Sequence, residues 1–470
     1  MGKADKETNY NENIRDEQAT KDSMPFPDGN VNGISGRSPT KVLRHCNKEN
    51  VTQNQDILNA VFELSSTKEN DEAKEFGTLL LLGVMLLLFI ISITGFFIMW
   101  FTEFYNDTML SQLVLKNNSE IAKNWMDPNP KYDTLLKVHI FNYTNIDKYL
   151  NGIDEKLKVE DVGPLTYKEH TTKVNVVFNN NFTVTFRRNG TSVDSLQINT
   201  GEDDIRKFSI ITQFNGHPLL DFWTDEECNR IDGSDASMFP PHILDNKEDL
   251  QVFLQVLCRK IPLHFEKEVT ILNNIDALRY RTPLNVFSNP KENPGNACYC
   301  HNTQLCLPSG IINATKCYNG APIFPSFPHF FSGDPEIYKD FDGINPSQEL
   351  HQTYADIHPR FAFPISGASR IQINIAVHKG QLLKRKLGRI KEGTVLPLIW
   401  IEITSGDFTD EVIDNLYIST FGLNAIQYAL KYGTLLACII SFALIVAGFY
   451  NLTQKRRQHS NPIQNKILEK

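Results

Sequence analysis

Hydrophobic residues are concentrated in two uninterrupted runs near the ends of this 470-residue chain, and the long stretch between them is polar. The first run, residues 76–101, contains no charged residue. At about 1.5 Å per residue, a helix of this length exceeds the thickness of the bilayer core. The second run, residues 432–450, is just long enough to cross. Both runs are predicted to be transmembrane helices.

Charges beside the second run predict the topology. The basic residues Lys455, Arg456 and Arg457 follow it directly, and positive charge favours the cytoplasmic side. Two spans return the chain to the side from which it started. We therefore expect cytoplasmic tails at residues 1–75 and 451–470, and an extracytoplasmic loop at residues 102–431.

The first 75 residues are rich in Asn, Gln, Asp, Glu and Lys and poor in aromatic residues. Such a segment buries too little apolar surface to offset the entropy lost on ordering, so it is predicted to be a disordered tail. One apolar pattern within residues 57–64 fits a short amphipathic helix, for which a transient solvated helix is favoured over a docking or membrane-surface role.

Alternating apolar and polar positions predict that strands dominate the loop. Residues 182–186 alternate between two turn signals, as in a hairpin. Isoleucine alternates with Gln and Asn over residues 371–375, which indicates a half-buried strand. Residues 395–403 form a more continuous apolar run, typical of a central strand, and Pro397 marks an edge or a bulge there.

Two further segments have other patterns. Residues 246–260 are the best helix candidate of the loop, because Leu250, Phe253, Leu254 and Leu257 share one helical face. Residues 321–331 are irregular and aromatic. A proline-pinned loop that packs its own rings is favoured there over a wall of a ligand cavity.

The sequence contains no recognisable catalytic motif. Nucleotide-binding glycine loops, a serine nucleophile elbow and a paired-histidine zinc motif are all missing from it. The loop histidines His329, His351 and His358 have no spacing that pairs them with a nucleophile or a metal. The acidic run at residues 225–227 fits a solvated turn or helix start better than an acid–base pair. We expect no enzyme activity and no cofactor, and the net charge of −8 argues against nucleic acid as a partner.

Six of the eight cysteines cluster in the loop, whereas Cys46 and Cys438 stand apart. An even, clustered set predicts disulfides in an oxidising compartment, and six cysteines allow fifteen connectivities. A zinc site is the less favoured alternative, because C-x-C is an atypical zinc knuckle; its ligands would be Cys298, Cys300, His301 and Cys306. The clustered cysteines are Cys228, Cys258, Cys298, Cys300, Cys306 and Cys317.

Glycosylation signals support the same topology. Six N-x-S/T motifs lie in the loop. Two more, at Asn50 and Asn451, lie in the predicted cytoplasmic tails and are expected to be silent. The expected sites are Asn106, Asn117, Asn142, Asn181, Asn189 and Asn313.

Several motifs in order resemble the class B scavenger receptor family. They include VEDVGPLTYKE (159–169), FWTDEECNRIDGSDASMFPP (222–241), PLNVFSNPKENPGNACYC (283–300) and DGINPSQELHQTYADIHP (342–359). Together with the two-span hairpin, the resemblance covers roughly residues 76–455. It implies a mixed α/β membrane protein with an antiparallel β-barrel core, short helices and an apolar tunnel. It also implies three bridges, Cys228–Cys298, Cys258–Cys317 and Cys300–Cys306.

One departure from the family lies between the hairpin and Phe222. Family members usually carry several tens more residues here, which form a helical bundle at the apex of the ectodomain. That bundle is where the family is thought to dock lipoproteins, fatty acids or partner proteins. The apical helical segment of this chain is therefore expected to be shortened.

The resemblance implies a receptor that binds fatty acids, sterol esters or lipoproteins and passes cargo through the tunnel to membrane lipids. Plasma membrane is the favoured location. The alternative is a lysosomal or endosomal receptor that sorts a protein partner. Such sorting favours an acidic dileucine signal, but the position four before Ile467-Leu468 is Ile463 rather than an acid.

Overall fold

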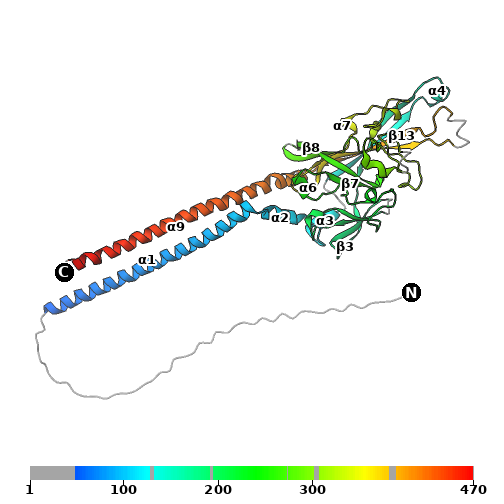
Figure 1. The fold of residues 1–470 in the computed structure, drawn as a ribbon. Coiled ribbons are helices and arrows are strands. Elements are labelled where there is room, and N and C mark those ends of the chain that lie inside the picture. The colour runs from blue at the N-terminus through cyan, green and yellow to red at the C-terminus, as the bar shows by residue number, and fades with distance from the viewer. Residues whose placement is uncertain are drawn as a thin grey trace, which may run out of the picture. The chain divides into compact units, whose positions relative to one another are not determined.

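The computed structural model describes residues 48–127, 132–190, 194–272, 274–300, 306–379 and 388–468 (Figure 1). The chain divides into two compact units, residues 1–77 and 78–470. In the first unit, the described residues belong to helix α1 (Lys48–Phe101), which continues into the second unit. The helix thus includes residues 48–75, for which composition predicts disorder. A long apolar helix supplies a nucleus from which preceding residues propagate at low cost.

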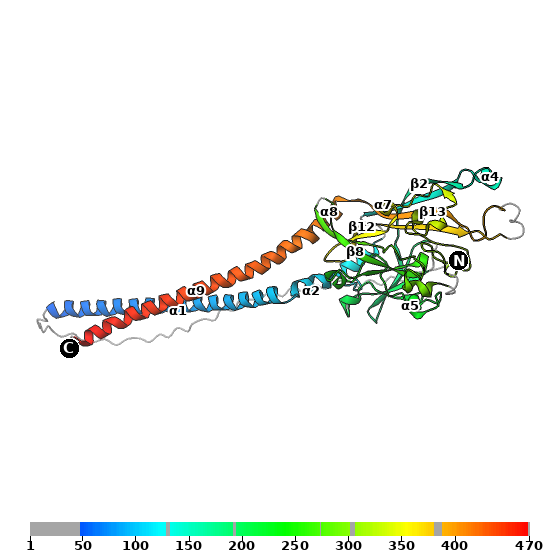
Figure 2. The same ribbon diagram turned by 45° about the horizontal axis from the view of Figure 1, so that its top comes forward.

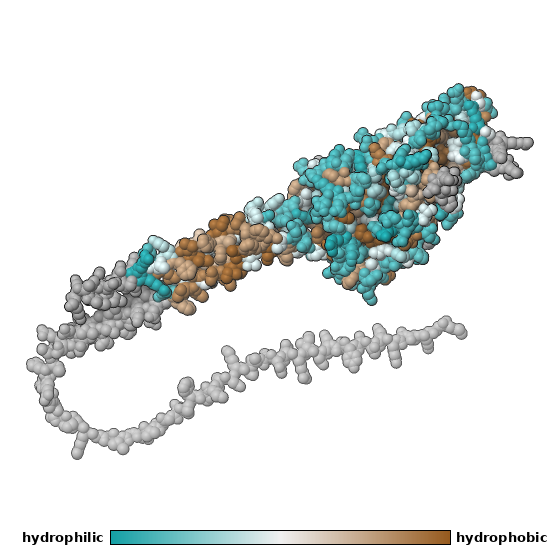
Figure 3. Space-filling view, in the orientation of Figure 1, coloured by the Kyte–Doolittle hydropathy of each residue, from teal (hydrophilic) through white to brown (hydrophobic). Residues whose placement is uncertain are grey.

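Among the residues that the structure describes, two helices are long and apolar enough to cross a membrane: residues 73–101 within α1, and residues 410–457. The second stretch comprises α8 (Asp410–Tyr417), the π-helical turn η7 (Ile418–Gly422) and most of α9 (Leu423–Leu468). Apolar surface covers this part of the molecule (Figure 3). These helices include both predicted spans.

The two spanning helices pack against each other (Figures 1 and 2). The rings of Phe89 and Phe442 lie 5.8 Å apart between centroids. The indole of Trp100 donates a hydrogen bond to the backbone oxygen of Lys431 at 3.1 Å. A Cβ atom on Gly95 would lie 3.1 Å from the Thr434 methyl group, so this glycine allows close approach.

The described strands form two sheets. The larger has nine strands in the order β10-β2-β1-β13-β12-β11-β9-β8-β7, and the smaller has the order β3-β4-β5-β6. All pairs are antiparallel except β10 with β2. The large sheet comprises β1 (Tyr132–Tyr143), β2 (Leu157–Glu169), β7 (Leu250–Leu254), β8 (Arg259–Ile271), β9 (Ile275–Arg281), β10 (Phe341–Asp342), β11 (Tyr354–Ile357), β12 (Pro364–Ala376) and β13 (Val395–Phe408). The small sheet comprises β3 (Lys173–Asn179), β4 (Thr183–Arg188), β5 (Ser195–Asn199) and β6 (Ile211–Phe214).

The helices outside the spans are short. They lie at strand ends and in connections, as expected for the loop region. They are α2 (Phe104–Leu110), α3 (Glu120–Met126), α4 (Ile146–Leu150), α5 (Glu226–Asn229), α6 (His242–Asp245) and α7 (Gln348–His351), and the 3₁₀ turns η1 (Ser111–Leu113), η2 (Ile205–Lys207), η3 (Gln255–Leu257), η4 (Pro294–Tyr299), η5 (Pro328–Phe330) and η6 (Pro335–Ile337).

The large sheet is open along the part of the chain that the structure describes. Its end strands, β10 and β7, each pair with one neighbour and not with each other. The mixed α/β class is confirmed, but the closed barrel that the resemblance implies is not. The stretch between residue 190 and Phe222, where relatives are expected to carry extra helices, here forms β5, η2 and β6.

The predicted hairpin is confirmed as β3 and β4. Val184 and Phe186 are fully buried in the core of the small sheet. Phe182 lies in the turn instead of the strand, with a φ of 58° and an exposed side chain. The Asn-rich turn therefore extends one residue further than the alternation indicates.

The helix predicted over residues 246–260 is wrong. Its residues form β7 and η3, and β7 pairs with β8 in register Val252 to Ile261. Cys258 adopts a left-handed conformation and turns the chain into β8. Pairing with β8 and burial of Leu250 outweigh the helical spacing of the leucines, because tertiary contacts routinely override local propensity.

The strand predicted over residues 395–403 is confirmed as part of β13, which lies between β1 and β12. The register with β12 shifts where Asn374 pairs with Pro397. This irregularity agrees with the edge or bulge expected at Pro397, because proline cannot donate a ladder hydrogen bond.

Candidate functional site

The centre of the large sheet has one apolar face. Register places Ile140 opposite both Val162 and Ile399, and Val138 opposite both Leu165 and Ile401. Because side chains alternate along a strand, these residues project to the same side. We call this surface the apolar face; its residues are Leu136, Val138, Ile140, Val162, Leu165, Tyr167, Ile371, Ile373, Ile399, Ile401 and Ile403.

The apolar face is open at its β2 end. None of its residues is buried, and on β2 Val162 is 43% exposed, Leu165 45% and Tyr167 56%. At the β12 end, Ile371 packs against a buried group that includes Phe287 and other core residues. Contiguous apolar surface of this kind marks an interaction or ligand-binding surface.

The opposite face of the same strands is polar, and it is buried. Gln372 and Asn374 are fully buried, although Ile373 between them is not. The Asn374 amide donates to the Phe324 backbone oxygen at 2.7 Å and to the Ser326 hydroxyl at 2.9 Å. The predicted half-buried strand is confirmed, but its polar side is the buried one, because residues 321–331 cover it and satisfy its hydrogen bonds.

A network of rings and one carboxylate lies on this polar face. Asp161 Oδ2 accepts hydrogen bonds from His329 Nε2 and Trp400 Nε1, both at 3.0 Å. Asp161 Oδ1 lies 3.0 Å from His139 Nδ1. The Asn345 backbone N–H donates to His329 Nδ1 at 3.1 Å, so Nε2 must carry the proton that bonds to the carboxylate.

Burial raises the pKa of Asp161, but the hydrogen bonds from His329 and Trp400, together with His139, outweigh it and hold that pKa below its usual value. His351 stacks on His329 with ring centroids 4.5 Å apart. Burial, followed by the electrostatic effects of His329 and Arg370, lowers the pKa of His351 to about 4. The network therefore holds a carboxylate beside neutral His351 at neutral pH.

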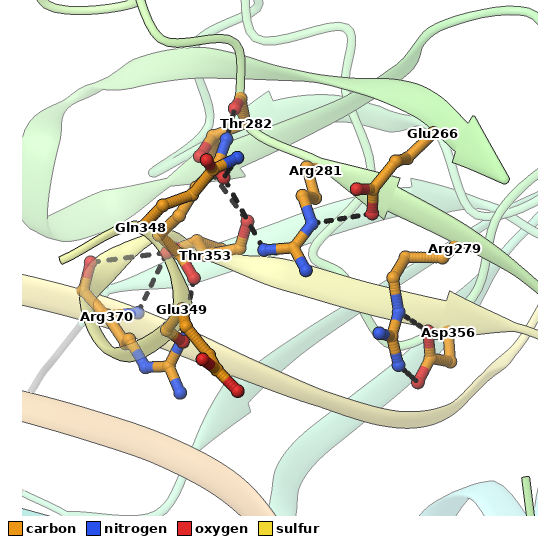
Figure 4. Close-up of polar contacts among 10 residues, drawn as sticks. Glu266, Arg279, Arg281, Thr282, Gln348, Glu349, Thr353, Asp356 and Arg370 are labelled. Atoms are coloured by element: carbon orange, nitrogen blue, oxygen red, sulfur yellow. Dashed lines mark hydrogen bonds and ion pairs between the residues drawn. The ribbon is translucent and has the colours of Figure 1, made fainter. Parts of the chain in front are cut away.

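An arginine cluster extends the polar face (Figure 4). The guanidinium groups of Arg279, Arg281 and Arg370 lie 4.7, 5.4 and 5.7 Å from the centre of the Tyr354 ring. Each is paired with a carboxylate. Arg279 pairs with Asp356 at 2.7 Å. Arg281 pairs with Glu266, and Arg370 with Glu402, both at 2.6 Å. With its charges paired, the cluster joins β8, β9, β11, β12 and β13 rather than offering a free anion site.

Two cavities lie beside the cysteine-rich segment. One of about 50 Å³ is lined by Arg259, Phe287 and Ile312, among others. The other, of about 100 Å³, is lined by Phe222, Trp223 and Lys316, among others. The cavities share Tyr299, Cys300 and Asn313 in their walls. Residues 321–331 line neither of these two. Phe324, Phe327 and Phe330 of that segment are buried in the core, in agreement with a loop that packs its own rings.

The structure contains disulfides Cys228–Cys298, Cys258–Cys317 and Cys300–Cys306, the same pairs that the resemblance implies. No group of three or more His, Cys, Asp or Glu side chains that could hold a metal is found among the described residues. His301 lies outside them. The zinc alternative thus loses three of its four ligands to disulfides.

The expected glycosylation sites lie at the surface of the loop region. The side chains of Asn117, Asn142, Asn181 and Asn189 are exposed, and those of Asn106 and Asn313 are half-buried. The acidic residues 225–227 lie at the start of α5, where Arg230 and Lys260 pair with them. This arrangement agrees with a helix start rather than an acid–base pair.

The spacing of the three loop histidines does not predict that any of them meet. In the structure, His329 and His351 stack on each other in the network. His358 does not join them; its Nε2 lies 3.3 Å from the Thr420 hydroxyl beside the second span. Sequence reasoning missed His139 and Asp161 entirely. The one local signal was a polar residue at each of these positions within otherwise strand-like segments.

Known proteins with related sequences support one family. The chain is 26% identical to lysosome membrane protein 2 of Homo sapiens over 387 residues, covering 63% of this chain and 79% of the relative. It is 34% identical to sensory neuron membrane protein 1 of Bombyx mori, covering 46% and 40%. It is 29% identical to scavenger receptor class B member 1 of Sus scrofa, covering 53% and 47%.

The alignment with lysosome membrane protein 2 extends over 387 positions but includes only 63% of this 470-residue chain. The relative therefore carries residues that have no counterpart here. The CD36 family profile matches in two parts, residues 81–193 and 186–449. The parts overlap at residues 186–193, at the end of the hairpin and directly before the stretch where the shortened segment is expected. With most of its length matched, two apolar helices and three disulfides, the chain is a class B scavenger receptor-like membrane protein and belongs to the CD36 family.

Proposed function

We propose that this protein is a receptor that binds lipids or lipoproteins and passes hydrophobic cargo to the membrane. The observation that carries this proposal is the apolar face, whose β2 residues are about half exposed. An acyl chain or sterol ester laid on it would remove apolar surface from water on both partners, at about 25 cal/mol per Å². Such transfer requires no catalytic group.

The chain path supports delivery towards the bilayer. Strand β13 ends at Phe408, and α8, which leads into the second span, begins at Asp410. Ile403 is therefore the residue of the apolar face that lies nearest to the second span along the chain. We propose that a covering element, a partner or the cargo itself closes this face into a conduit, in place of the closed barrel implied by the resemblance.

The direct test is lipid extraction from the full-length protein purified from a eukaryotic host. We expect lipid to co-purify with the wild type and to fall several-fold in Leu165→Asp, because a carboxylate on the apolar face opposes acyl-chain contact. Thr166→Asp is the matched control, since Thr166 is exposed on the neighbouring position of β2. Equal lipid content in all three proteins would contradict the proposal.

We further propose that both tails are cytoplasmic, that the protein lies in the plasma membrane and that the six loop sequons carry glycans. Exposure of Asn142 and Asn181 supports glycan attachment. Removal of the glycans by glycosidase should shift the mobility of the protein, and the shift should become smaller in Asn142→Gln. A shift that instead disappears in Asn451→Gln would reverse the topology.

The alternative is a lysosomal or endosomal receptor that sorts a protein partner. It is favoured by the match to a lysosome membrane protein over 79% of that relative's length. Surface biotinylation of the full chain at its native expression level separates the two. A pool found mainly at the surface supports the lipid receptor, and a pool found mainly in acidic compartments supports the sorting receptor.

A further inference from the structure

Asn313 differs from most of the other expected glycosylation sites, because it lies in the wall of a cavity. The cavity of about 100 Å³ is lined by Asn313 together with the rings of Phe222, Trp223 and Tyr299. Four of the other five expected sites are exposed. A sugar on an exposed asparagine extends into water, whereas a sugar on Asn313 has to lie against the walls of this cavity.

The side-chain amide of Asn313 is oriented for attachment of a glycan. Its Oδ1 accepts a hydrogen bond from the Thr315 backbone N–H at 3.0 Å, and its Nδ2 bonds to no residue that the structure describes. Nδ2 is the atom that carries an N-linked glycan. Asn106, the other half-buried site, differs, because its Nδ2 donates to Glu103 Oε2 at 2.7 Å.

Disulfides hold the walls of the cavity together. Trp223 and Tyr299 meet edge to face, with ring centroids 5.0 Å apart, and the bridge Cys228–Cys298 joins their two segments. The Trp223 indole donates to the backbone oxygen of Cys258 at 2.6 Å. The bridge Cys258–Cys317 joins that turn to the segment that contains the sequon. Because the walls are fixed in advance, a group that packs on them loses less of its binding energy to ordering.

The size of the cavity fits part of one sugar. A volume of about 100 Å³ corresponds to roughly three molecules of liquid water. It therefore accommodates the four heavy atoms of an acetamido group but not a whole pyranose ring. The C–H bonds on one face of a pyranose are weakly positive, and they are attracted to the negative face of an aromatic ring. Lys316 lies exposed at the rim and can donate to sugar hydroxyls.

We propose that this cavity holds the first N-acetylglucosamine of a glycan on Asn313. The acetamido group enters the cavity, the pyranose ring packs on Trp223, and the hydroxyls face Lys316 and water. The sugar thereby stabilises the disulfide-bonded segment to which it is attached. This inference rests on the glycosylation of the loop proposed above, and it does not depend on lipid binding.

The experiment compares Thr315→Ala with Thr315→Ser in the full-length protein from a eukaryotic host. Both variants keep the backbone N–H that bonds to Asn313, but only serine keeps the sequon. We expect Thr315→Ala to unfold about 2 °C below Thr315→Ser. Asn117→Gln, which removes a glycan from an exposed site, should leave the unfolding midpoint unchanged. Endoglycosidase H, which leaves the first sugar on a high-mannose glycan, should also leave the midpoint unchanged.

A ring variant tests the contact itself. In a Trp223→Leu background, the difference between Thr315→Ala and Thr315→Ser should shrink to less than half, because groups in contact are energetically coupled. Phe222→Leu, in the same wall, covers the case in which Trp223→Leu does not fold. Equal midpoints for the two Thr315 variants, an undiminished difference in the ring variant, or a lower midpoint after endoglycosidase H treatment would overturn the proposal.

Mass spectrometry of glycopeptides separates this proposal from the proposed function. Glycans on Asn117 but not on Asn313 overturn only the present proposal, whereas glycans on neither overturn the proposed topology as well. Neither result affects the lipid test with Leu165→Asp, which concerns the apolar face.

Discussion

Asp161 on β2 accepts a hydrogen bond from His329, which lies 168 residues later in the chain, at 3.0 Å between Oδ2 and Nε2. The same carboxylate contacts His139 on β1 and Trp400 on β13. One side chain thus joins three adjacent strands to the loop that covers the polar face. That face is held by directional polar contacts, which leaves the apolar side chains for the other side of the sheet.

Replacing Asp161 with Asn should lower the free energy of unfolding by about 2 kcal/mol, because charge-assisted hydrogen bonds become neutral ones and one amide group cannot accept from all three donors. Thermal unfolding followed by tryptophan fluorescence measures this in the full-length protein. Glu160→Gln is the control, because Glu160 is exposed one position earlier in β2. Similar midpoints for the two variants would show that the network adds little stability.

The hydrophobic pattern predicts much of the fold. Long apolar runs identify both spans, and period-two alternation finds the strands around Val184 and Ile373. Both signals are local, and they depend on which residues are apolar. Residues 246–260 were predicted as a helix because their leucines also fit a helical period, and the long-range pairing with β8 that decides the outcome leaves no local trace.

The candidate site could not be predicted in the same way. Hydrophobicity favours burial of Ile373 over that of Gln372, yet the structure buries Gln372. Its side-chain oxygen accepts from the backbone N–H of His329, 43 residues away in the covering loop, and its amide donates to Asn374 on the same strand. His139, Asp161 and His329 meet only after the sheet has formed.

Gln372→Leu should destabilise the protein by about 2 kcal/mol, although it makes the strand more hydrophobic. The substitution leaves the His329 backbone N–H and an Asn374 oxygen without their partners, and an unsatisfied buried group costs about 1–3 kcal/mol. Ile375→Asn should cost about 0.5 kcal/mol, because Ile375 is exposed. Chemical denaturation of both variants gives the comparison, and the reverse order would show that the polar face is not the buried one.

Stability should fall as the pH drops from 6.5 to about 4. Burial lowers the pKa of His351 and of His358 to about 4, with neighbouring positive charges adding to the effect. The unfolded chain, with a histidine pKa near 6.5, then binds more protons than the folded chain in this window. The stabilisation is complete above pH 6.5 and is lost as the pH approaches 4, by roughly 3 kcal/mol for each histidine at most.

Unfolding midpoints measured between pH 4.5 and 7 test this prediction. The double variant His351→Asn and His358→Asn should show a shallower slope, since Asn keeps an acceptor near the position of Nδ1 but does not titrate there. His242→Asn is a suitable control, because His242 is an exposed histidine. An unchanged slope in the double variant would assign the acid sensitivity to other groups.

The contact between the spans should be detectable by cross-linking. Cysteines replacing Phe89 and Phe442, whose rings are 5.8 Å apart, should form an intramolecular bridge on mild oxidation in a chain with Cys46→Ser and Cys438→Ser. Leu87→Cys paired with Phe442→Cys should not, because Leu87 is 59% exposed and lies about half a turn away from Phe89. Adding Gly95→Leu should reduce the yield of the first bridge, since its side chain would meet Thr434 and push the helices apart. A high cross-linking yield in every pair would indicate that the two spans move relative to each other. The spans would then not hold the apolar face in a fixed position relative to the bilayer.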